Sequence, residues 1–217
     1  GQGGTNYPLR GVRNKQIRIR CQHETSLLTQ LFCLSSSQWK TQLYEGGIRV
    51  PGFVHSALLP SAVRGTVHRG LFHVSDWLPT VVIGIAGGNT DRNLALDGYN
   101  IWPSIIGGPD VKSPRTEVLH TLNAACGMGF VYPNAALRVG DMKLLVDCFN
   151  YTTMQATGLV ELYNITDDPF EYTNLAPDRP ATVAQLISKL RKYAASPDQV
   201  PPVLFPENAP AVPAPGI

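Results

Sequence analysis

Two stretches decide the fold of this chain: Pro8-Leu9-Arg10-Gly11 and Trp39-Lys40-Thr41-Gln42-Leu43-Tyr44-Glu45-Gly46-Gly47-Ile48-Arg49-Val50-Pro51. When the residues from Val12 to Gln38 are left out, the two stretches join into one motif, in which aromatic residues flank a lysine and a Glu-Gly-Gly turn follows. The sequence therefore indicates one structural motif that is interrupted by an inserted segment.

The inserted segment, Val12 to Gln38, differs from its surroundings in charge and composition. Its first half is basic, and its second half is rich in Leu, Ser and Phe, with no clean period. Val-Arg codons can form a splice donor, Leu, Phe and Ser codons a pyrimidine tract, and a Gln codon an acceptor. We therefore predict an insertion that is not part of the native fold, namely an intron retained in frame. A lineage-specific surface loop is the alternative.

The composition predicts a globular protein and gives no support to a nucleic-acid partner. Of the 217 residues, 43% are hydrophobic, and the formal net charge is only +2, with its excess confined to the insertion. No membrane span is expected, because no run approaches the roughly 18 apolar residues that one requires. The chain begins without Met or a signal-like layout, which favours a removed leader or an internal fragment.

The cysteines and two glycosylation sequons favour a secreted or lysosomal protein. Two of the four cysteines lie in the insertion, and the other two are Cys126 and Cys148. No Cys-x-x-Cys motif occurs, so zinc and thiol-redox sites have no support. Asn150 and Asn164 begin the two sequons, which suit a chain that passes through the secretory pathway.

The N-terminal half is predicted to contain a strand and a helix. Leu43 to Val54 is expected to form a strand and turn. Val74 to Ala86 is expected to form a helix that ends at Gly87 and has one apolar face. The side chains of that face are Leu78, Val81, Val82 and Ile85.

From residue 114 the pattern is that of a small antiparallel sheet followed by an amphipathic helix. The predicted strands are Thr116–Leu122, Ala135–Val139, Met142–Val146 and Leu159–Tyr163, with a hairpin turn at Gly140-Asp141. The helix is expected over Asp178–Ala195. Its apolar stripe is Val183, Leu186, Ile187, Leu190 and Ala194. The tail after Ser196 holds 7 of the 18 prolines and is expected to be extended or disordered.

The joined motif resembles the sulfatase family, and in particular its arylsulfatase B branch. The family pattern is Pro-Leu-Arg-Gly, an aromatic residue, an active-site lysine, a second aromatic residue and Glu-Gly-Gly-[Val/Ile]-Arg. The run from Tyr163 to Leu175 also matches the family's strand-turn signature, and the resemblance continues to about residue 206.

This resemblance implies an α/β fold like that of alkaline phosphatase. Residues 1–113 would form the C-terminal part of the large domain, interrupted by the insertion at 12–38. Residues 114–196 would form the small domain, with a four-stranded antiparallel sheet and a long helix, and residues 197–217 a Pro-rich tail.

The resemblance assigns one catalytic residue to this chain. Lys40 stands where the family lysine contacts the substrate sulfate, and its ammonium would neutralise charge on the sulfuryl oxygens. His120 follows a predicted strand, where relatives line the pocket mouth, and is the second candidate for substrate binding. The family's formylglycine nucleophile is made in Cys-x-Pro-x-Arg or Ser-x-Pro-x-Arg, and neither motif is present. Calcium ligands are expected upstream of Gly1, so no metal ligand is assigned to this chain.

Other residues of the family motifs are expected to have structural roles. For Glu45 and Arg49 the expected roles are to form pairs with other residues and to brace the turn. His73 would pack or cap a helix. Turn and cap roles are also expected for the acidic residues of the second motif, Asp167, Asp168 and Glu171. Cys126 and Cys148 align with family cysteines that flank the hairpin, which implies a disulfide, with two buried free thiols as the alternative.

These assignments predict a sulfuric ester hydrolase that uses calcium and formylglycine to act on sulfated sugars or aryl sulfates. The first alternative is a catalytically inactive product, truncated or mis-spliced, because the nucleophile is missing. The second is another hydrolase of the alkaline-phosphatase superfamily, such as a phosphodiesterase. The Trp-Lys-x-x-x-Tyr-Glu-Gly-Gly string argues against the second alternative.

Overall fold

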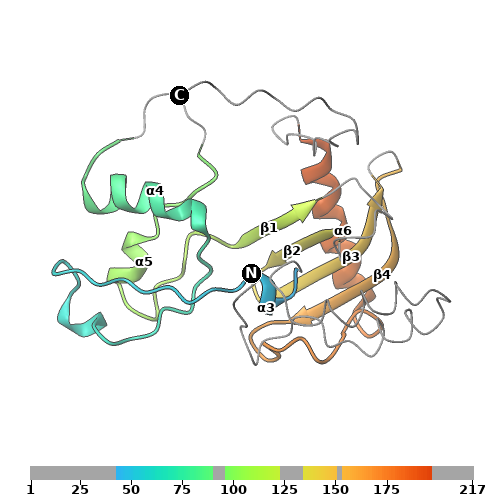
Figure 1. Cartoon of the computed structure of the whole chain (residues 1–217), viewed down its shortest axis with the longest axis horizontal. Coiled ribbons are helices and arrows are strands. Elements are labelled where there is room, and N and C mark those ends of the chain that lie inside the picture. Colours follow the sequence, from blue (N-terminus) through green and yellow to red (C-terminus); the bar gives the residue numbers. More distant parts are fainter. Residues whose placement is uncertain (1–42, 90–95, 123–133, 151–152, 197–217) are drawn as a thin grey trace, which may run out of the picture.

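The computed structural model describes residues 43–89, 96–122, 134–150 and 153–196 (Figure 1). The short helices of the first half are α3 (Glu45–Ile48), α4 (Trp77–Pro79) and α5 (Trp102–Ile106). Next to them are 3-10 turns at Ser61–Val63 and Val74–Asp76 and a π-helical turn at Thr80–Ile85. The second half contains β1 (Glu117–Leu122), β2 (Ala135–Val139), β3 (Met142–Asn150), β4 (Gln155–Asn164) and the long helix α6 (Pro180–Ala195).

The four strands form an antiparallel sheet in the order β1-β2-β3-β4, which confirms the predicted sheet. Gly140, with a φ of 55°, closes the β2–β3 hairpin in the left-handed region that glycine adopts without strain. β3 and β4 are longer than predicted, because they resume pairing after an irregularity between Val146 and Cys148.

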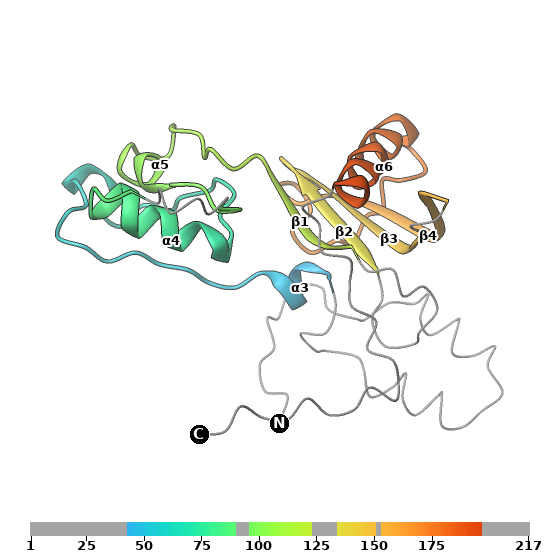
Figure 2. The same ribbon diagram turned by 90° about the horizontal axis from the view of Figure 1, so that it is seen from above.

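α6 covers one face of the sheet and completes the main hydrophobic core (Figure 2). Its Leu186 and Leu190 are buried in one cluster with Leu144 and Leu162 of the strands. All five residues of the predicted apolar stripe belong to this core or pack against it, so the predicted amphipathic helix is confirmed. Burying one leucine contributes about 2 kcal/mol, which makes this face a main source of stability.

α3 lies on the opposite face of the sheet (Figure 2). The strand and turn predicted from Leu43 onward are wrong at this point, because the chain forms one helical turn, in which the Arg49 N–H donates to the Glu45 carbonyl oxygen at 2.8 Å. The segment packs its side chains on the face of the sheet, instead of pairing with an edge strand. Its backbone groups therefore bond within the segment and to the Glu171 side chain, and not to an edge strand.

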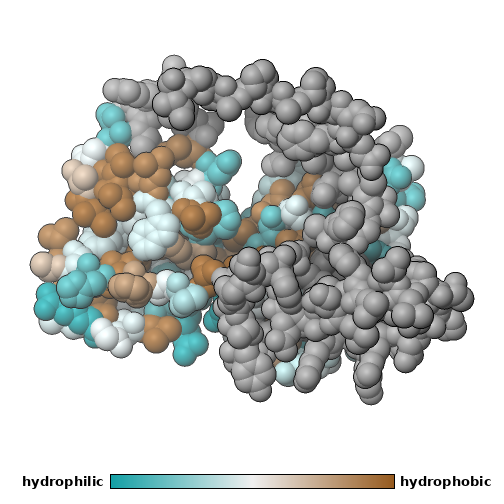
Figure 3. Space-filling view, in the orientation of Figure 1, coloured by the Kyte–Doolittle hydropathy of each residue, from teal (hydrophilic) through white to brown (hydrophobic). Residues whose placement is uncertain are grey.

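The predicted helix from residue 74 to 86 is present as consecutive 3-10, α- and π-helical turns that end before Gly87. Its predicted apolar face is not buried, since Leu78 and Val81 are 55% and 47% exposed. The π-helical turn changes the residue spacing on which that prediction depended. The buried residues of the segment are Asp76, Pro79 and Thr80. Apolar side chains are visible over α4 in the space-filling view (Figure 3).

Several predictions concern residues outside the described ranges. They include the insertion at 12–38, the tail at 197–217, Lys40 and Cys126. The domain boundary at residues 113 and 114 also stays a prediction.

Candidate functional site

The motif that contains Lys40 continues into the described part of the chain, which begins at Leu43. Lys40 itself lies outside the described residues, whereas Tyr44 and Glu45 of the same motif are 0% and 2% exposed. Polar side chains that are buried to this degree require hydrogen-bond partners. Those partners define how the motif is attached to the sheet.

Lys143 of β3 is the centre of a buried ionic cluster with Glu45 and Glu171. Its Nζ donates to Glu45 Oε1 at 2.9 Å and to Glu171 Oε1 at 2.8 Å. The backbone N–H of Glu45 donates to Glu171 Oε2 at 2.7 Å, so the three residues form a closed set of contacts. The predicted pairing role of Glu45 is therefore confirmed.

Tyr44 is attached to the same face of the sheet by a second set of contacts. Its hydroxyl donates to Glu161 Oε2 at 2.5 Å, and the Tyr163 hydroxyl donates to Glu161 Oε1 at 2.9 Å. Each oxygen of this buried carboxylate thus receives a charge-assisted hydrogen bond. Two consecutive residues of the motif, Tyr44 and Glu45, are therefore fixed by directional contacts.

Glu171 has a role that the sequence did not predict. It is fully buried in the ionic cluster and has a φ of 55°, which is uncommon for a residue other than glycine. Burial raises the pKa of its carboxyl, although Lys143 acts in the opposite direction. The unusual backbone angle persists where surrounding contacts determine it. Asp168 does have the predicted turn role, because its Oδ2 accepts a hydrogen bond from the Thr173 N–H at 2.8 Å.

His120 lies at an irregularity in the pairing of β1 with β2. A bulge of this kind redirects a side chain, and His120 Nε2 is buried without a hydrogen-bond partner among the described residues. Burial, together with the charges of Lys143, His73 and Arg138, lowers the pKa of His120 to about 3. The imidazole is therefore neutral near pH 7. Its contact with substrate stays a prediction.

A second buried ion pair connects the helical segment at residue 74 to the chain that leads into β1. Arg115 donates from Nη2 and Nε to the two Asp76 carboxylate oxygens, at 2.6 and 2.7 Å. Burial alone would raise the pKa of Asp76, but the hydrogen bonds from Arg115 and from the Tyr99 and His73 N–H groups hold it below its usual value. The His73 side chain accepts a bond from the Ser75 N–H, which confirms its predicted capping role.

The described ranges contain no group of three His, Cys, Asp or Glu side chains that could hold a metal ion. The carboxylates nearest to the motif, Glu45 and Glu171, are occupied by Lys143. The calcium that the family implies therefore does not fit the described part of the chain. Among the described helices, none has the length and apolar character to cross a membrane.

The predicted modification sites differ in accessibility. Cys148 is disulfide-bonded, but Cys126 lies outside the described residues, so the pairing of these two stays a prediction. Asn150 is exposed at the end of β3. Asn164 is half-buried, and its Nδ2 donates to Asp167 Oδ2 at 2.6 Å. Asn150 is therefore the more accessible of the two sequon residues.

Lys143 and Glu161 are the residues of this site that the sequence analysis missed. Each is a charged residue between two apolar neighbours in its strand, and a buried charge requires a partner. That signal was present in the sequence. The partners could not be identified without the strand register, which sets Lys143 opposite Tyr163 and Leu145 opposite Glu161.

Comparison with known proteins connects this arrangement to an enzyme family. No family model matches the chain. The chain is similar to arylsulfatase J of Mus musculus, with 31% identity over an alignment of 235 positions that covers 92% of this chain and 34% of the relative. It thus spans about a third of the length of this relative.

A solved structure shares the fold. It is described under the metabolism of multiple glycosaminoglycans by Bacteroides thetaiotaomicron and carries the label 6S-sulf. The two chains are 22% identical with a TM-score of 0.52, over 73% of this chain and 32% of the other. This likeness confirms the predicted sulfatase fold, with its four-stranded antiparallel sheet and long helix. The sequence match and the shared fold support a sulfatase family for this chain.

Proposed function

We propose that this chain supplies the C-terminal part of a sulfuric ester hydrolase that acts on sulfated sugars or aryl sulfates. The 31% identity to arylsulfatase J over 92% of the chain is the observation that carries the proposal. The buried attachment of Tyr44 and Glu45 supports it, because it ties the motif with the family lysine to the sheet.

In this proposal Lys40 stabilises the negative charge that develops on the sulfuryl oxygens. His120 is neutral near pH 7, so it would offer the substrate a hydrogen bond and not a positive charge. The 217 residues contain neither motif from which formylglycine is made. The nucleophile, and calcium with it, would therefore come from sequence outside these residues.

A second candidate function follows from the same missing motif. A chain with a charge-stabilising lysine but no nucleophile has no covalent route to ester cleavage. The chain would then be a catalytically inactive member of the family. Both candidate functions have the same fold. They differ only in whether sequence outside these residues supplies a nucleophile.

The compartment is proposed from the disulfide. Cys148 is disulfide-bonded, and such bonds persist in oxidising compartments, so we place the protein in the lysosome or outside the cell. The proposed bond joins Cys126 and Cys148, and glycans are proposed on Asn150 and Asn164. Peptide mapping without reductant tests the bond, and alkylation of both cysteines in the native protein would disprove it.

Turnover of a chromogenic aryl sulfate with added calcium tests the activity. We expect none from the 217-residue chain, and activity from a chain that is extended upstream of Gly1 and lacks residues 12–38. In the extended chain, Lys40→Ala should lower the rate by about 10²- to 10³-fold. Lys192→Ala, an exposed change on α6, is the matched control.

Two outcomes of this assay would contradict the proposal. Turnover by the 217-residue chain above its own Lys40→Ala variant would show that the nucleophile is already present. A folded extended chain without activity would favour the inactive family member.

A further inference from the structure

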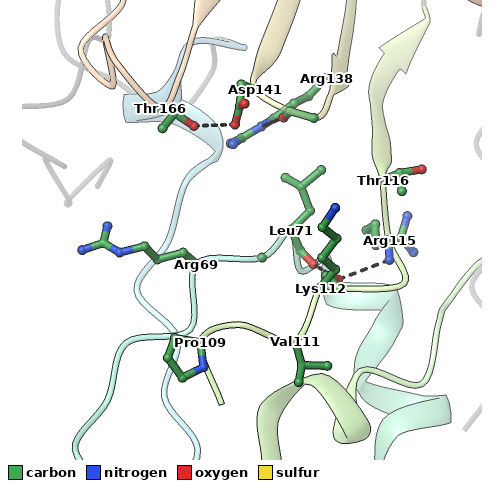
Figure 4. A pocket seen from close by; sticks show the side chains of 13 residues that line it. Arg69, Leu71, Pro109, Val111, Lys112, Arg115, Thr116, Arg138, Asp141 and Thr166 are labelled. Carbon is green, nitrogen blue, oxygen red and sulfur yellow. Dashed lines mark hydrogen bonds between the residues drawn. The ribbon is translucent and has the colours of Figure 1, made fainter. Parts of the chain in front are cut away.

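A pocket of about 470 Å³ lies between the helical segments and the β2–β3 hairpin (Figure 4). Its volume is in the range that small ligands occupy. Four basic residues are among those that line it: Arg69, Lys112, Arg115 and Arg138. Three hydroxyl residues, Ser113, Thr116 and Thr166, are also part of its wall.

The four basic residues are not equally available to a ligand. Arg115 is committed to Asp76 by two short hydrogen bonds. Arg69 and Lys112 are exposed, and neither has an ion pair within the described ranges. In Figure 4, Lys112 extends toward the centre of the pocket from the helical side, whereas Arg69 extends sideways.

Arg138 faces the pocket from the sheet side (Figure 4). Its Nε donates to the Gly140 carbonyl oxygen at 3.0 Å, and its two terminal nitrogens have no hydrogen-bond acceptor in the described part of the chain. Burial lowers the pKa of this guanidinium, and Glu45 and Arg49 of the Lys40 motif also act on it. Arg138 is the cross-strand partner of Lys143, whose Nζ donates to Glu45 of the Lys40 motif. The pocket therefore adjoins that motif and contains a half-buried cation.

The charges of the lining do not balance. Asp141 is its one carboxylate, and Oδ1 of this residue accepts a hydrogen bond from the Thr166 hydroxyl at 2.5 Å. Arg69, Lys112 and Arg138 thus exceed the acidic charge by two. A partly desolvated guanidinium that lacks a carboxylate partner is stabilised when an anion binds to it.

We propose that this pocket is an accessory subsite that binds a sulfate or carboxylate group of an acidic saccharide. The inference rests on the proposed function, because a sulfated sugar bound at the Lys40 motif would bring further charged groups to this neighbouring pocket. A guanidinium matches the planar geometry of such oxyanions. Of the three hydroxyl residues, Ser113 and Thr166 already donate to Leu71 and Asp141, so Thr116 is the one whose hydroxyl suits a sugar hydroxyl. Nucleic acid is disfavoured, because no aromatic side chain lines the pocket to stack on a base.

Titration calorimetry of the 217-residue chain with a chondroitin sulfate tetrasaccharide tests the subsite. Lys112→Gln should weaken binding by about tenfold, since a charge-assisted hydrogen bond contributes roughly that much. Arg138→Gln should weaken it at least as much. Lys192→Gln removes the same charge from α6 and should change the affinity less than twofold. Lys112 is exposed, so its variant is expected to fold even if Arg138→Gln does not.

The unsulfated tetrasaccharide distinguishes the two ligand groups. Retained binding that still depends on Lys112 assigns the pocket to the carboxylate, and lost binding assigns it to the sulfate; either result supports the subsite. Three results would overturn it: no binding by the original chain, an unchanged affinity of Lys112→Gln, or equally tight binding of an RNA oligomer. Binding requires no nucleophile, so failure here is separable from failure of the turnover assay.

Discussion

The two faces of the β-sheet bury their side chains in opposite ways. On the face toward α6, Leu144 and Leu162 pack with apolar residues of the helix. On the face toward α3, Lys143 and Glu161 are buried as deeply but are charged, and they lie beside a smaller apolar cluster that includes Leu145 and Ile165. Lys143 and Leu144 are consecutive in β3, and successive strand residues point to opposite faces. One strand therefore contributes to two environments of different chemistry.

The contacts on one face mainly stabilise the fold, and those on the other face position the motif. An apolar face tolerates exchanges among hydrophobic residues of similar volume, because its contacts are not directional. Buried charges are costly unless each has a partner in the correct place. The α3 face therefore accepts only a segment with matching groups, which Tyr44 and Glu45 provide.

The largest effect is expected from Lys143→Met. The substitution leaves the carboxylates of Glu45 and Glu171 buried without their ammonium, which should cost about 3–5 kcal/mol in urea unfolding. Burial already raises the pKa of Glu171, so its ionised form is the unfavourable one. The deficit should shrink as the pH falls toward the usual range of a carboxyl group, because a protonated Glu171 no longer needs the ammonium.

A triple variant provides the control for Lys143→Met. Adding Glu45→Gln and Glu171→Gln removes the orphaned charges and should recover more than half of the lost stability. If the single variant is within 1 kcal/mol of the original protein, the ionic cluster has no special importance.

The apolar face should respond differently to Leu162→Ala. This change removes a fully buried side chain and leaves a cavity, with an expected cost of about 3 kcal/mol. No charge is exposed, so the cost should be the same at pH 5 and pH 8. A strong dependence on pH would show that the apolar face is coupled to the ionic cluster on the other face.

His120→Leu should change the acid sensitivity of the protein. The folded pKa of His120 is about 3, below its usual 6.5, so the unfolded chain takes up a proton first as the pH falls. The stability contribution is complete above 6.5 and is lost between 6.5 and about 3, by at most about 1.4 kcal/mol per pH unit.

Unfolding measured at pH 7 and pH 5 checks this prediction. Over that interval the variant should lose about 2 kcal/mol less than the original protein. His55→Leu alters an exposed histidine and serves as the matched control. Equal losses in the original protein and in His120→Leu would show that His120 is not held neutral by its surroundings.

The sheet and α6 could be predicted from the sequence because their patterns are local. The Gly140-Asp141 turn between two apolar runs predicted the β2–β3 hairpin, and the stripe from Val183 to Ala194 predicted the buried face of α6. The same approach failed for Leu78 and Val81, because a π-helical turn altered the spacing. It also failed for the segment at Glu45, where contacts with distant residues decide the backbone conformation.

The candidate site was only partly predictable for the same reason. The family motif identified Glu45 and its pairing role, but its partner Lys143 is 98 residues away in the sequence. The carboxylate that binds Tyr44 is 117 residues away. Such partners become visible only when the register of β3 and β4 is known.

The smallest effect, and the most specific one, is expected from Tyr44→Phe. The change removes one of the two hydroxyl groups that donate to Glu161 and leaves the ring in the core, so it should cost about 1 kcal/mol. Tyr163→Phe removes the other hydroxyl from the same carboxylate and is the matched control. The two variants should therefore have similar global stability.

Hydrogen exchange separates the two tyrosines. Tyr44 belongs to the motif, and its carbonyl oxygen accepts bonds from the Gly47 and Ile48 N–H groups. In Tyr44→Phe, these amides should exchange about fivefold faster while the amides of α6 change little, because the segment opens locally. In Tyr163→Phe, the lost bond lies within β4, so α3 should stay protected. Equal exchange at α3 in both variants would mean that the Tyr44 hydroxyl does not position the motif, and that the polar face, like the apolar one, contributes only to overall stability.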